Sequence, residues 1–485
     1  MGLINSLKEI LGVTPVNIGE LNRAAAGKAE RAESFSIASD LPENIEITGE
    51  YQQIITLIDS GVPLIFVSGK AGTGKTTLVH YLRSVSRKNI VVVAPTGVAA
   101  LNVKGATIHS FFRLPPRMIT DEDIKEVRNR RVYEKIDILV IDEISMVRAD
   151  VVDAMDQFLR LNGPVAGKPF GGIQIVFVGD LFQLSPVVKK REEEILWARR
   201  YETPFFFSAK ALQRCQFAPV ELSRTYRQTD TEFVAMLDRV RAAEELGTVV
   251  PRINQYCYAE ADGRPSLITL TCTNAAADEI NRTKLDELPG EVKTFTGEIS
   301  GKFDIQHEKL PSPLELRLKP GAQVMFTKND ELKRWVNGTI GRVTGFEGNV
   351  IRVELVSGQP GEICDVRQVS WESFKYEYDA ARDKIKPVTI GKYTQFPLML
   401  AWAVTIHKSQ GKTLEKVKVD LGEGAFAPGQ VYVALSRCRS LQDITLARPI
   451  KRTEIKCDQR IKRFYEALAR EHDEGTLEQK GGMGR

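Results

Sequence analysis

The sequence lacks the cysteine spacing of a metal-binding or disulfide-stabilised protein. Its six cysteines lie far apart, and no two of them form a C-x-x-C pair. Zinc ribbons, iron–sulfur clusters and disulfide frameworks depend on closely or regularly spaced cysteines, so the pattern argues against each of them. We expect reduced thiols with structural roles.

Long apolar runs and a strong charge imbalance are also missing. No hydrophobic stretch approaches the ~18 residues that a membrane-spanning helix requires, so we expect no membrane partner. The 67 basic residues nearly balance the 63 acidic ones, which gives a net charge of +4. This balance permits nucleic-acid binding without indicating it, because local clustering of charge matters more than the total. The 485 residues are enough for about three domains.

A glycine-rich loop is the most specific feature that the sequence contains. Residues 69–76 fit the phosphate-loop pattern G-x-x-x-x-G-K-[ST] directly after the apolar run 64–68, which predicts a buried strand. The glycines allow backbone N–H groups to face phosphate oxygens. Lys75 supplies a positive charge for the β- and γ-phosphates, and Thr76 supplies a hydroxyl for Mg²⁺. The residues predicted to bind a nucleoside triphosphate here are Gly72, Thr73, Gly74, Lys75, Thr76 and Thr77.

Polar residues that suit the same chemistry follow two other predicted strands. Residues 136–143 predict a buried strand that ends in two carboxylates: Asp142, which would hold Mg²⁺, and Glu143, which would take a proton from the attacking water. Residues 173–178 predict another strand, after which Gln183 could sense the γ-phosphate. Upstream of the loop, Gln52 in a predicted helix could read an adenine edge through its amide, with Gln53 as the rival.

The order of the predicted elements indicates an α/β fold. Strands and helices alternate up to about residue 215, which predicts a doubly wound parallel sheet with its ligand at the carboxyl ends of the strands. A second set of such units follows. Short strands with glycine turns interrupt it from 314 to 394 and predict a small inserted β-barrel. We expect helix again over residues 398–406, and a charged excursion without a strand over residues 113–135.

The motifs, taken in order, resemble those of superfamily-one helicases. Four blocks are similar to those of the petite-integration-frequency (PIF-type) DNA helicases of the RecD-like branch. They are Ala-Pro-Thr-Gly-Val-Ala-Ala (94–100), Thr-Ile-His-Ser-Phe-Phe (107–112), Asp-Glu-Ile-Ser-Met-Val (142–147) and Thr-Ile-His-Lys-Ser-Gln-Gly (405–411). The resemblance covers residues 47–450. It implies two RecA-like lobes with ATP between them and 5′-to-3′ movement on single-stranded DNA.

The resemblance and the composition together predict how the chain is divided. The predicted units are an N-terminal arm (1–45), lobe one (46–215) with a wedge (113–135), lobe two (216–313 and 395–450), an SH3-like insertion (314–394), and a C-terminal helix and tail (451–485).

Several residue roles are implied by matching position. Arg227 and Arg437 become arginine fingers that reach the γ-phosphate, so that hydrolysis requires closure of the lobes. Gln183 becomes the residue that couples hydrolysis to movement. With Lys75 and Glu143, these residues form the expected catalytic set. The residues in implied DNA-contacting motifs are Pro95, Thr96, Gly97, His109, Phe112, Thr405, His407, Lys408 and Ser409. From the residues alone, core packing explains one of Phe111 and Phe112 equally well.

Three other functions fit part of the pattern. An ATPase or small-molecule kinase would need the phosphate loop, but not the second lobe or the 405–411 motif. An ATP-gated clamp on single strands would not need every catalytic candidate to be present. An RNA helicase of similar architecture stays open, because backbone contacts and base stacking read the 2′-hydroxyl weakly.

The resemblance favours an ATP-dependent DNA helicase that acts in replication, repair, recombination or telomere maintenance. The expected cofactors are ATP and Mg²⁺, and the expected partners are single-stranded and forked DNA. We expect a monomer during translocation. The expected location is the cytoplasm, at the nucleoid, in a bacterium, and the nucleus or mitochondrion in a eukaryote.

Overall fold

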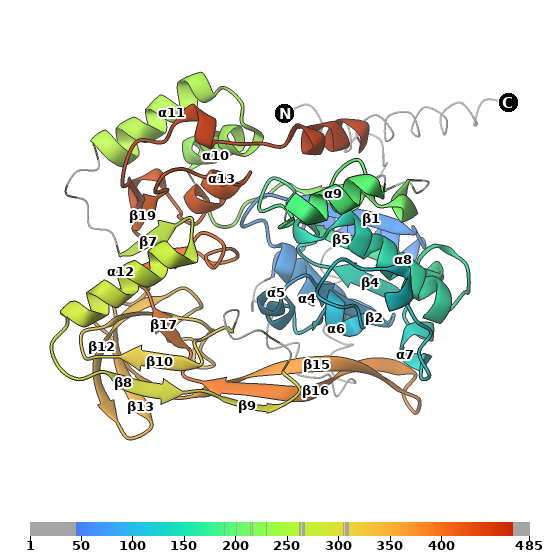
Figure 1. The fold of residues 1–485 in the computed structure, drawn as a ribbon, viewed down its shortest axis with the longest axis horizontal. Helices are drawn as coiled ribbons and strands as arrows, with labels where there is room; N and C mark the ends of the chain where they lie inside the picture. Colours follow the sequence, from blue (N-terminus) through green and yellow to red (C-terminus); the bar gives the residue numbers. More distant parts are fainter. Residues whose placement is uncertain are drawn as a thin grey trace.

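The protein is described by a computed structural model that covers residues 45–468. Residues 189, 200, 214, 216, 229, 261–262, 264–266, 304 and 306–309 are not described. The predicted N-terminal arm therefore lies almost entirely outside the described residues, as does the tail after residue 468. Two parallel α/β sheets and a set of antiparallel sheets make up the described chain (Figure 1).

Six parallel strands form the sheet of lobe one, in the order β3-β2-β4-β5-β1-β6. The strands are β1 Leu64–Gly69, β2 Ile90–Ala94, β3 Ala106–Thr107, β4 Ile138–Ile141, β5 Gln174–Gly179 and β6 Ala218–Leu222. The sheet extends past the predicted lobe boundary at residue 215, because β6 pairs with β1 along five residues from Ile65↔Ala218 to Gly69↔Leu222. The first lobe thus ends later than the sequence predicts.

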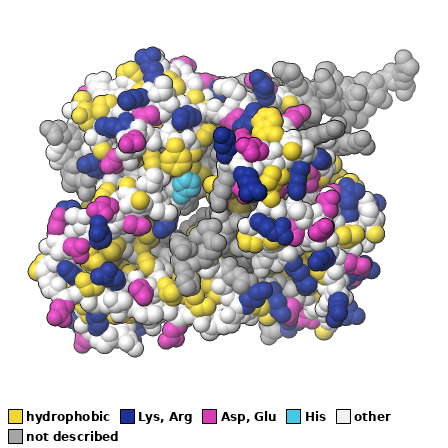
Figure 2. All heavy atoms as spheres, in the orientation of Figure 1, with side chains coloured by type: hydrophobic (Ala, Val, Ile, Leu, Met, Phe, Trp, Pro, Cys, Tyr) yellow, Lys and Arg dark blue, Asp and Glu magenta, His cyan; other side chains and the backbone are white. Residues whose placement is uncertain are grey.

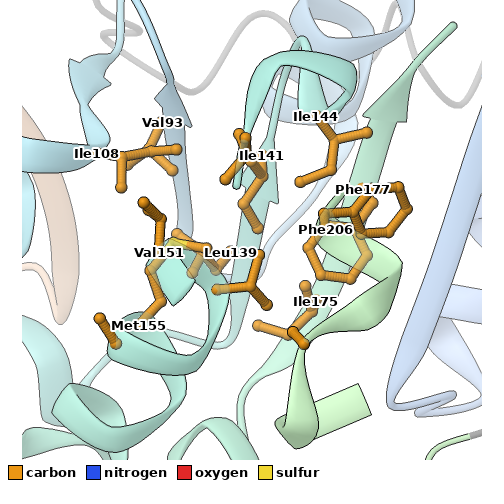
Figure 3. Close-up of a cluster of buried hydrophobic side chains, with 14 of the residues drawn as sticks. Val93, Ile108, Leu139, Ile141, Ile144, Val151, Met155, Ile175, Phe177 and Phe206 are labelled. Atoms are coloured by element: carbon orange, nitrogen blue, oxygen red, sulfur yellow. The ribbon is translucent and has the colours of Figure 1, made fainter. Parts of the chain in front are cut away.

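Both faces of this sheet are covered by helices, which explains the continuous Val and Ile runs of its strands. Alternate side chains of a strand point to opposite faces. Leu139 and Ile141 of β4 join one hydrophobic core with α8 (Ala149–Asn162), whereas Ile138 and Val140 join another with α3 (Gly49–Asp59) and α4 (Lys75–Val85). In Figure 3, Val151 and Met155 of α8 face Leu139 across the first of these cores.

The excursion 113–135 contains no strand among its described residues, as expected. It holds the 3-10 turn Asp121–Asp123 and the short helix α7 (Arg131–Glu134). Leu114, Ile119 and Tyr133 of the excursion are buried in the same core as α8. The excursion is therefore packed against lobe one along much of its length. The remaining helices of lobe one are α5 (Gly97–Asn102), α6 (Ile108–Phe111) and α9 (Lys190–Ala198).

Four parallel strands form the sheet of lobe two, in the order β18-β7-β19-β20. They are β7 Ile268–Thr271, β18 Ala403–Thr405, β19 Val417–Asp420 and β20 Ile444–Leu446, and the helices of this lobe are α10 Thr231–Ala242, α11 Leu246–Asn254, α12 Asn274–Glu287 and α13 Gln430–Leu435. The prediction of helix over residues 398–406 is wrong, because this segment forms β17 (Leu398–Leu400) and β18. A short apolar run has no period that distinguishes a buried strand from a buried helix.

Antiparallel strands fill the predicted insertion. Four of them, β11 Gln323–Phe326, β12 Ile340–Glu347, β13 Val350–Leu355 and β14 Ile363–Val366, form one sheet with β17 in the order β14-β13-β12-β11-β17. Short strands were expected here, but the long hairpin of β15 (Val369–Asp379) and β16 (Lys384–Gln395) was not. This hairpin pairs with β9 (Glu298–Gly301) and runs beneath lobe one in Figure 1. A separate pair joins β8 (Lys293–Thr296) to β10 (Glu315–Leu318).

The end of the described chain returns from lobe two to lobe one. Ile450 and Ile455 belong to the core of lobe two. Residues 459–468 then form a helix. Its Phe464 packs against Phe66 of β1, with ring centroids 5.8 Å apart, and stacks on Phe207 at 4.4 Å. This C-terminal helix therefore connects the two lobes a second time.

Candidate active site at the junction of the lobes

The phosphate loop follows β1 and leads into α4, as the sequence predicts. Gly72 and Gly74 have φ angles of +80° and +85°, a region that side-chain-bearing residues rarely adopt. A methyl group at Gly72 would lie 2.6 Å from Cβ of Arg227, so the loop is in direct contact with the segment that carries this arginine. The backbone N–H of Tyr226 also donates to the Gly72 carbonyl at 2.9 Å.

Lys75 is folded back onto the loop. Its Nζ donates to the carbonyls of Gly69 and Lys70 at 2.7 and 2.9 Å. Burial lowers the pKa of the Lys75 ammonium, while the negative charges of Asp180, Glu143 and Asp142 act in the opposite direction. A buried ammonium held only by neutral carbonyls is well suited to bind an anion that enters the loop.

Asp142 and Glu143 follow β4 at the same edge of the sheet. Asp142 is 5% exposed, and its Oδ1 accepts from the backbone N–H of Glu143 at 3.0 Å. Burial, together with the charge of Glu143, raises the pKa of Asp142 to about 7, and burial raises the pKa of Glu143 as well. Two adjacent carboxylates, of which Asp142 is buried and Glu143 half-buried, favour a bound cation.

The donors at this edge fit Mg²⁺ held jointly by protein and nucleotide. Mg²⁺ commonly takes one or two protein oxygens and fills its remaining positions with water and phosphate oxygens. Asp142 and the Thr76 hydroxyl, which lies in the first turn of α4, would supply such oxygens. Within the described residues, no group of three or more His, Cys, Asp or Glu side chains is arranged to hold a metal ion. The site thus fits a metal that arrives with its nucleotide.

Asp180, at the end of β5, is the centre of a buried network that crosses from lobe one to lobe two. It is fully buried and accepts from Gln183 Nε2 at 3.0 Å. Arg241 of α10 donates to its Oδ1 at 3.0 Å, and the guanidinium lies 4.3 Å from the ring centroid of Phe182. Burial opposes the charged form of Asp180, but the Arg241 and Lys75 charges outweigh it and lower the pKa of this carboxyl.

Helix α13 of lobe two touches the same region from the other side. Its Tyr432 hydroxyl accepts from the backbone N–H of Ala71 in the phosphate loop at 3.1 Å and lies 3.4 Å from Asp180 Oδ2. Gly429, the N-cap of α13, lies so close to the loop after β5 that a methyl group there would be 2.3 Å from the Gln183 carbonyl oxygen. Only glycine permits this contact.

Arg227 and Arg437 converge beside the phosphate loop. Arg227 donates to the Thr413 hydroxyl at 3.0 Å and to the Ser436 carbonyl at 3.1 Å. Arg437 is 1% exposed, and its guanidinium donates to the Val433 carbonyl and the Ser436 hydroxyl, each at 2.8 Å. Burial and the charge of Arg227 lower the pKa of Arg437 to about 9.

No carboxylate among the described residues forms an ion pair with either arginine; Arg437 is buried and Arg227 is half-buried. Buried charges are normally paired, since an uncompensated one is costly. Two such guanidiniums next to a phosphate loop are therefore suited to receive the phosphates of a nucleotide.

The role of Gln52 in reading an adenine edge stays a prediction. Gln52 is exposed on α3, and its backbone carbonyl accepts from the Thr56 hydroxyl. The adjacent Tyr51 is buried, and its hydroxyl donates to the Gly74 carbonyl at 2.9 Å. The half-exposed ring of Tyr226 lies 3.7 Å from a methyl group built at Gly74, which leaves an aromatic face at the mouth of the loop.

The predicted DNA-contacting residues lie at strand ends in both lobes. Pro95, Thr96 and Gly97 follow β2, and the Thr96 hydroxyl accepts from Ala99 N as the N-cap of α5. His109 lies on α6, and His407 and Lys408 follow β18. The side chain of Lys408 is exposed, whereas burial lowers the pKa of His407.

Three of these predicted DNA-contacting residues are buried, and Gly97 is half-buried. Phe112 is 1% exposed in the core of lobe one, where its ring contacts Phe111 and Phe158 edge to face. Ser409 and Thr405 are buried, and they hydrogen-bond within their own turn. Gly97 is covered by Ile305, since a methyl group there would lie 2.7 Å from its Cδ1.

Surface charge does not mark a DNA path on the face drawn in Figure 2. Lysine and arginine side chains are spread over this face and interleaved with acidic ones. The DNA assignment must therefore rest on the loops after β2 and β18, and on the comparisons with known proteins.

Those comparisons are consistent with one another. A family model described as PIF1-like helicase matches residues 45–244. The ATP-dependent DNA helicase PIF1 of Mus musculus is 34% identical over an alignment that covers 95% of this chain and 72% of that protein. The chain belongs to the PIF1-like helicase family.

Solved structures of the PIF1-like family extend the likeness to the whole fold. Bacteroides sp Pif1 in complex with ADP-AlF4 has a TM-score of 0.79 at 38% identity, with 89% of this chain and 99% of that chain covered. Bacteroides Pif1 bound to single-stranded DNA has a TM-score of 0.63 at the same identity, with 87% of this chain and 97% of that chain covered. The arrangement of this chain is thus more similar to the complex with ADP-AlF4 than to the complex with single-stranded DNA.

Four residues of this PIF1-like site were not found from the sequence. The sequence favours the glutamine neighbours of Tyr51, although an aromatic ring beside them is a usable signal. Tyr432 and Gln410 lie inside conspicuous motifs, but no local feature assigns them a contact. Arg241 lies on an ordinary amphipathic helix, and nothing in its neighbourhood in the sequence indicates a buried partner.

Proposed function

We propose that this chain couples ATP hydrolysis between its two lobes to 5′-to-3′ movement along single-stranded DNA. As a PIF1-like helicase, it is an ATP-dependent DNA helicase. The observation that carries the proposal is the assembly of the site from both lobes. Tyr432 of lobe two accepts from Ala71 N in the phosphate loop, and Gln410 of lobe two donates to Glu143 and Gln183 of lobe one.

The roles of the site residues follow from their chemistry. Lys75 exchanges its two carbonyl partners for the β- and γ-phosphates, and Glu143 accepts a proton from the attacking water. Mg²⁺, held by Asp142 and Thr76, would neutralise part of the phosphate charge. Arg227 and Arg437 stabilise the charge that develops at the γ-phosphate, because phosphoryl transfer is catalysed mainly by positioning and electrostatics.

Movement on DNA follows from closure of the lobes. The loops after β2 and β18 bind the strand on lobe one and lobe two, chiefly through Thr96, His109, His407 and Lys408. Each cycle of nucleotide binding and release changes the distance between these loops, and the strand is moved by their alternating grip. The excursion 113–135 acts as the wedge at a fork.

The substrates and the setting are part of the proposal. We infer single-stranded and forked DNA as substrates and a monomer as the translocating species. Within the described residues, no helix is both long and apolar enough to cross a membrane. The proposed location is the nucleoid in a bacterial host, and the nucleus or mitochondrion in a eukaryotic one.

Unwinding of forked duplexes tests the proposal. Forks with a 5′ or a 3′ single-stranded arm, built from DNA and from RNA, are incubated with the protein, ATP and Mg²⁺. We expect unwinding only of DNA forks with a 5′ arm. Unwinding of RNA forks at the same rate as DNA forks would instead support an RNA helicase. DNA binding without unwinding would support an ATP-gated clamp.

Two variants test the assignment of the site. Lys75→Ala should abolish ATP hydrolysis and leave DNA binding largely intact, whereas Lys210→Ala, at an exposed lysine of lobe one, should change neither. Glu143→Gln should bind ATP and DNA but hydrolyse ATP slowly, because the Mg²⁺ ligand Asp142 remains and the base does not. Loss of ATP binding in Glu143→Gln would mean that Glu143 is the Mg²⁺ ligand and Asp142 the base.

A further inference from the structure

Gln410 of lobe two reaches the chemistry of lobe one. Its amide Nε2 donates to Glu143 Oε2 at 3.3 Å and to Gln183 Oε1 at 3.2 Å. An amide nitrogen carries two hydrogens, so one side chain can serve both acceptors at once. The two acceptors are the proposed general base and the proposed γ-phosphate sensor.

These contacts leave both partners occupied. The amide nitrogen of Gln183 donates to Asp180, and its amide oxygen accepts from Gln410, so both polar atoms of the side chain have a partner. One carboxylate oxygen of Glu143 accepts from Gln410. A hydrogen bond to a charged acceptor is about twice as strong as a neutral one, so the carboxylate is held in place. The arrangement fits a resting state better than a catalytic one.

Gln410 is joined closely to the residues proposed to bind DNA. It lies two residues after Lys408 in the turn that follows β18, and its backbone N–H donates to the His407 carbonyl at 3.2 Å. Ser409 is fully buried, and its hydroxyl donates to the Ile406 carbonyl at 2.7 Å. Because the turn is fixed by these bonds, a displacement of His407 and Lys408 moves Gln410 with them.

We propose that Gln410 is a positioning residue that holds Glu143 and Gln183 in a resting arrangement. Binding of single-stranded DNA then shifts the turn 405–411 and ends this arrangement. Release of the amide frees the carboxylate for water and the glutamine for the γ-phosphate. Single-stranded DNA thereby increases ATP hydrolysis, and idle turnover without DNA is suppressed. This inference rests on the proposed function of the site.

The energetic requirement is modest. A ligand shifts an equilibrium only by its differential affinity for the two states. Single-stranded DNA must therefore bind more tightly when the Gln410 amide is released from Glu143 and Gln183 than when it is bound to them. Loss of one charge-assisted hydrogen bond is enough for a change of about tenfold in rate. We therefore expect removal of the Gln410 amide to raise the DNA-independent rate by about this factor.

Steady-state ATP hydrolysis by the full chain tests the inference, measured without DNA and with saturating oligothymidylate. Gln410→Ala removes both donors, and Gln410→Glu keeps the size but replaces the donors with a carboxylate that repels Glu143. Both should raise the rate without DNA and lower the ratio of stimulated to unstimulated rates. Gln410→Asn keeps an amide that is one methylene shorter and should give an intermediate ratio.

Gln174→Ala is the matched control. Gln174 also donates two hydrogen bonds through its amide, to the carbonyls of Ile58 and Val62 at 3.1 Å each, but it lies at the start of β5, away from the site. Its loss should lower the melting temperature without changing the ratio. Melting curves of every variant separate a folding defect from the predicted effect.

Two outcomes would overturn the inference. One is an unchanged ratio in Gln410→Ala and Gln410→Glu, and the other is a parallel fall of both rates, which would make Gln410 a residue needed in the active arrangement. Both outcomes differ from those expected if the proposed helicase function itself is wrong. Failure of the proposed function would appear in the wild-type protein as an absence of DNA-stimulated hydrolysis, or as full activity in Lys75→Ala.

Discussion

Arg437 combines nearly complete burial with an absence of acidic partners among the described residues. Its donors are used by neutral oxygens of its own lobe, including the carbonyls of Val433 and Ser409. A charge in this position accelerates hydrolysis if it stabilises the transition state of phosphoryl transfer more than it stabilises bound ATP. Arg437→Ala should therefore lower the turnover number by about 10³ with a much smaller change in ATP affinity.

Single-turnover hydrolysis and nucleotide affinity, both on saturating single-stranded DNA, check this prediction. Lysine should rescue poorly, because it lacks the planar fork that contacts two oxygens. Arg227→Ala should show a similar loss, and the double variant should lose less than the sum, since both arginines act on one transition state. Unchanged hydrolysis in Arg437→Ala would remove this residue from the site.

At the same scale, the contact between Arg241 and Asp180 connects the two lobes through one ion pair. Truncation of one partner of a buried pair leaves the other charge uncompensated, at a cost of about 3–5 kcal/mol. Arg241→Ala should lower the unfolding free energy by this amount. Asp180→Asn also leaves Arg241 without its counter-charge, but it should cost less because the asparagine carbonyl oxygen still accepts a hydrogen bond from the guanidinium. Urea unfolding of both variants measures the difference.

The pH dependence of this pair has a definite sign. The folded-state pKa of Asp180 is lowered, so its contribution to stability is present above the unfolded pKa of about 4 and is lost as the pH falls below it. The stability difference between the wild type and Asp180→Asn should therefore shrink below about pH 4. A difference that is independent of pH would show that Asp180 is not charged in the folded protein.

At the scale of elements, the helix formed by residues 459–468 seals a cluster of aromatic rings on lobe one. Phe464 contacts Phe66, Phe206, Phe207 and Phe217. Phe464→Ala should cost about 3 kcal/mol, at the low end for a phenylalanine, because this ring is only partly buried. The matched control is Glu466→Ala, at an exposed position of the same helix.

Thermal unfolding of the two variants tests whether the helix of residues 459–468 stabilises lobe one or only lies on its surface. A melting temperature that falls equally in both would contradict the packing role of Phe464. If the helix holds the lobes together, Phe464→Ala should also increase protease cleavage between residues 450 and 459. Glu466→Ala should not.

At the scale of the whole molecule, the hairpin of β15 and β16 connects the insertion to lobe one. The Tyr376 hydroxyl donates to the Val92 carbonyl and accepts from the Val92 N–H, both at 3.1 Å, and its ring meets Phe111 edge to face at 5.7 Å. Tyr376→Phe keeps the ring but leaves two backbone groups of β2 without their partner. We expect a loss of about 1–3 kcal/mol in unfolding free energy.

Hydrogen exchange locates this effect. The Val92 amide should exchange faster in Tyr376→Phe, whereas amides of the lobe-two sheet should be unchanged. Tyr258→Phe, at a half-exposed tyrosine, serves as the control. An unchanged Val92 amide would mean that the hairpin does not dock on lobe one in solution.

The sequence by itself determined which segments carry the phosphate-binding and candidate catalytic side chains. Strand runs and loop glycines are local signals, and parallel strands bring their carboxyl ends to one edge, so the sequence alone assigns Lys75, Asp142, Glu143 and Gln183 to one site. The same local logic predicted the α/β class and an excursion without strands. It failed for residues 398–406, where an apolar run has no distinguishing period.

Tertiary structure alone decided which side chains meet. Phe112 packs in the core of lobe one, the Tyr51 hydroxyl contacts the phosphate loop, and β6 extends the sheet of lobe one beyond residue 215. Arg241 and Gln410 gain their roles from partners 61 and 267 residues away along the chain. Local patterns fix backbone conformation and the kind of group present. The partner of a buried group depends on how distant elements pack, and a one-dimensional pattern does not record that packing.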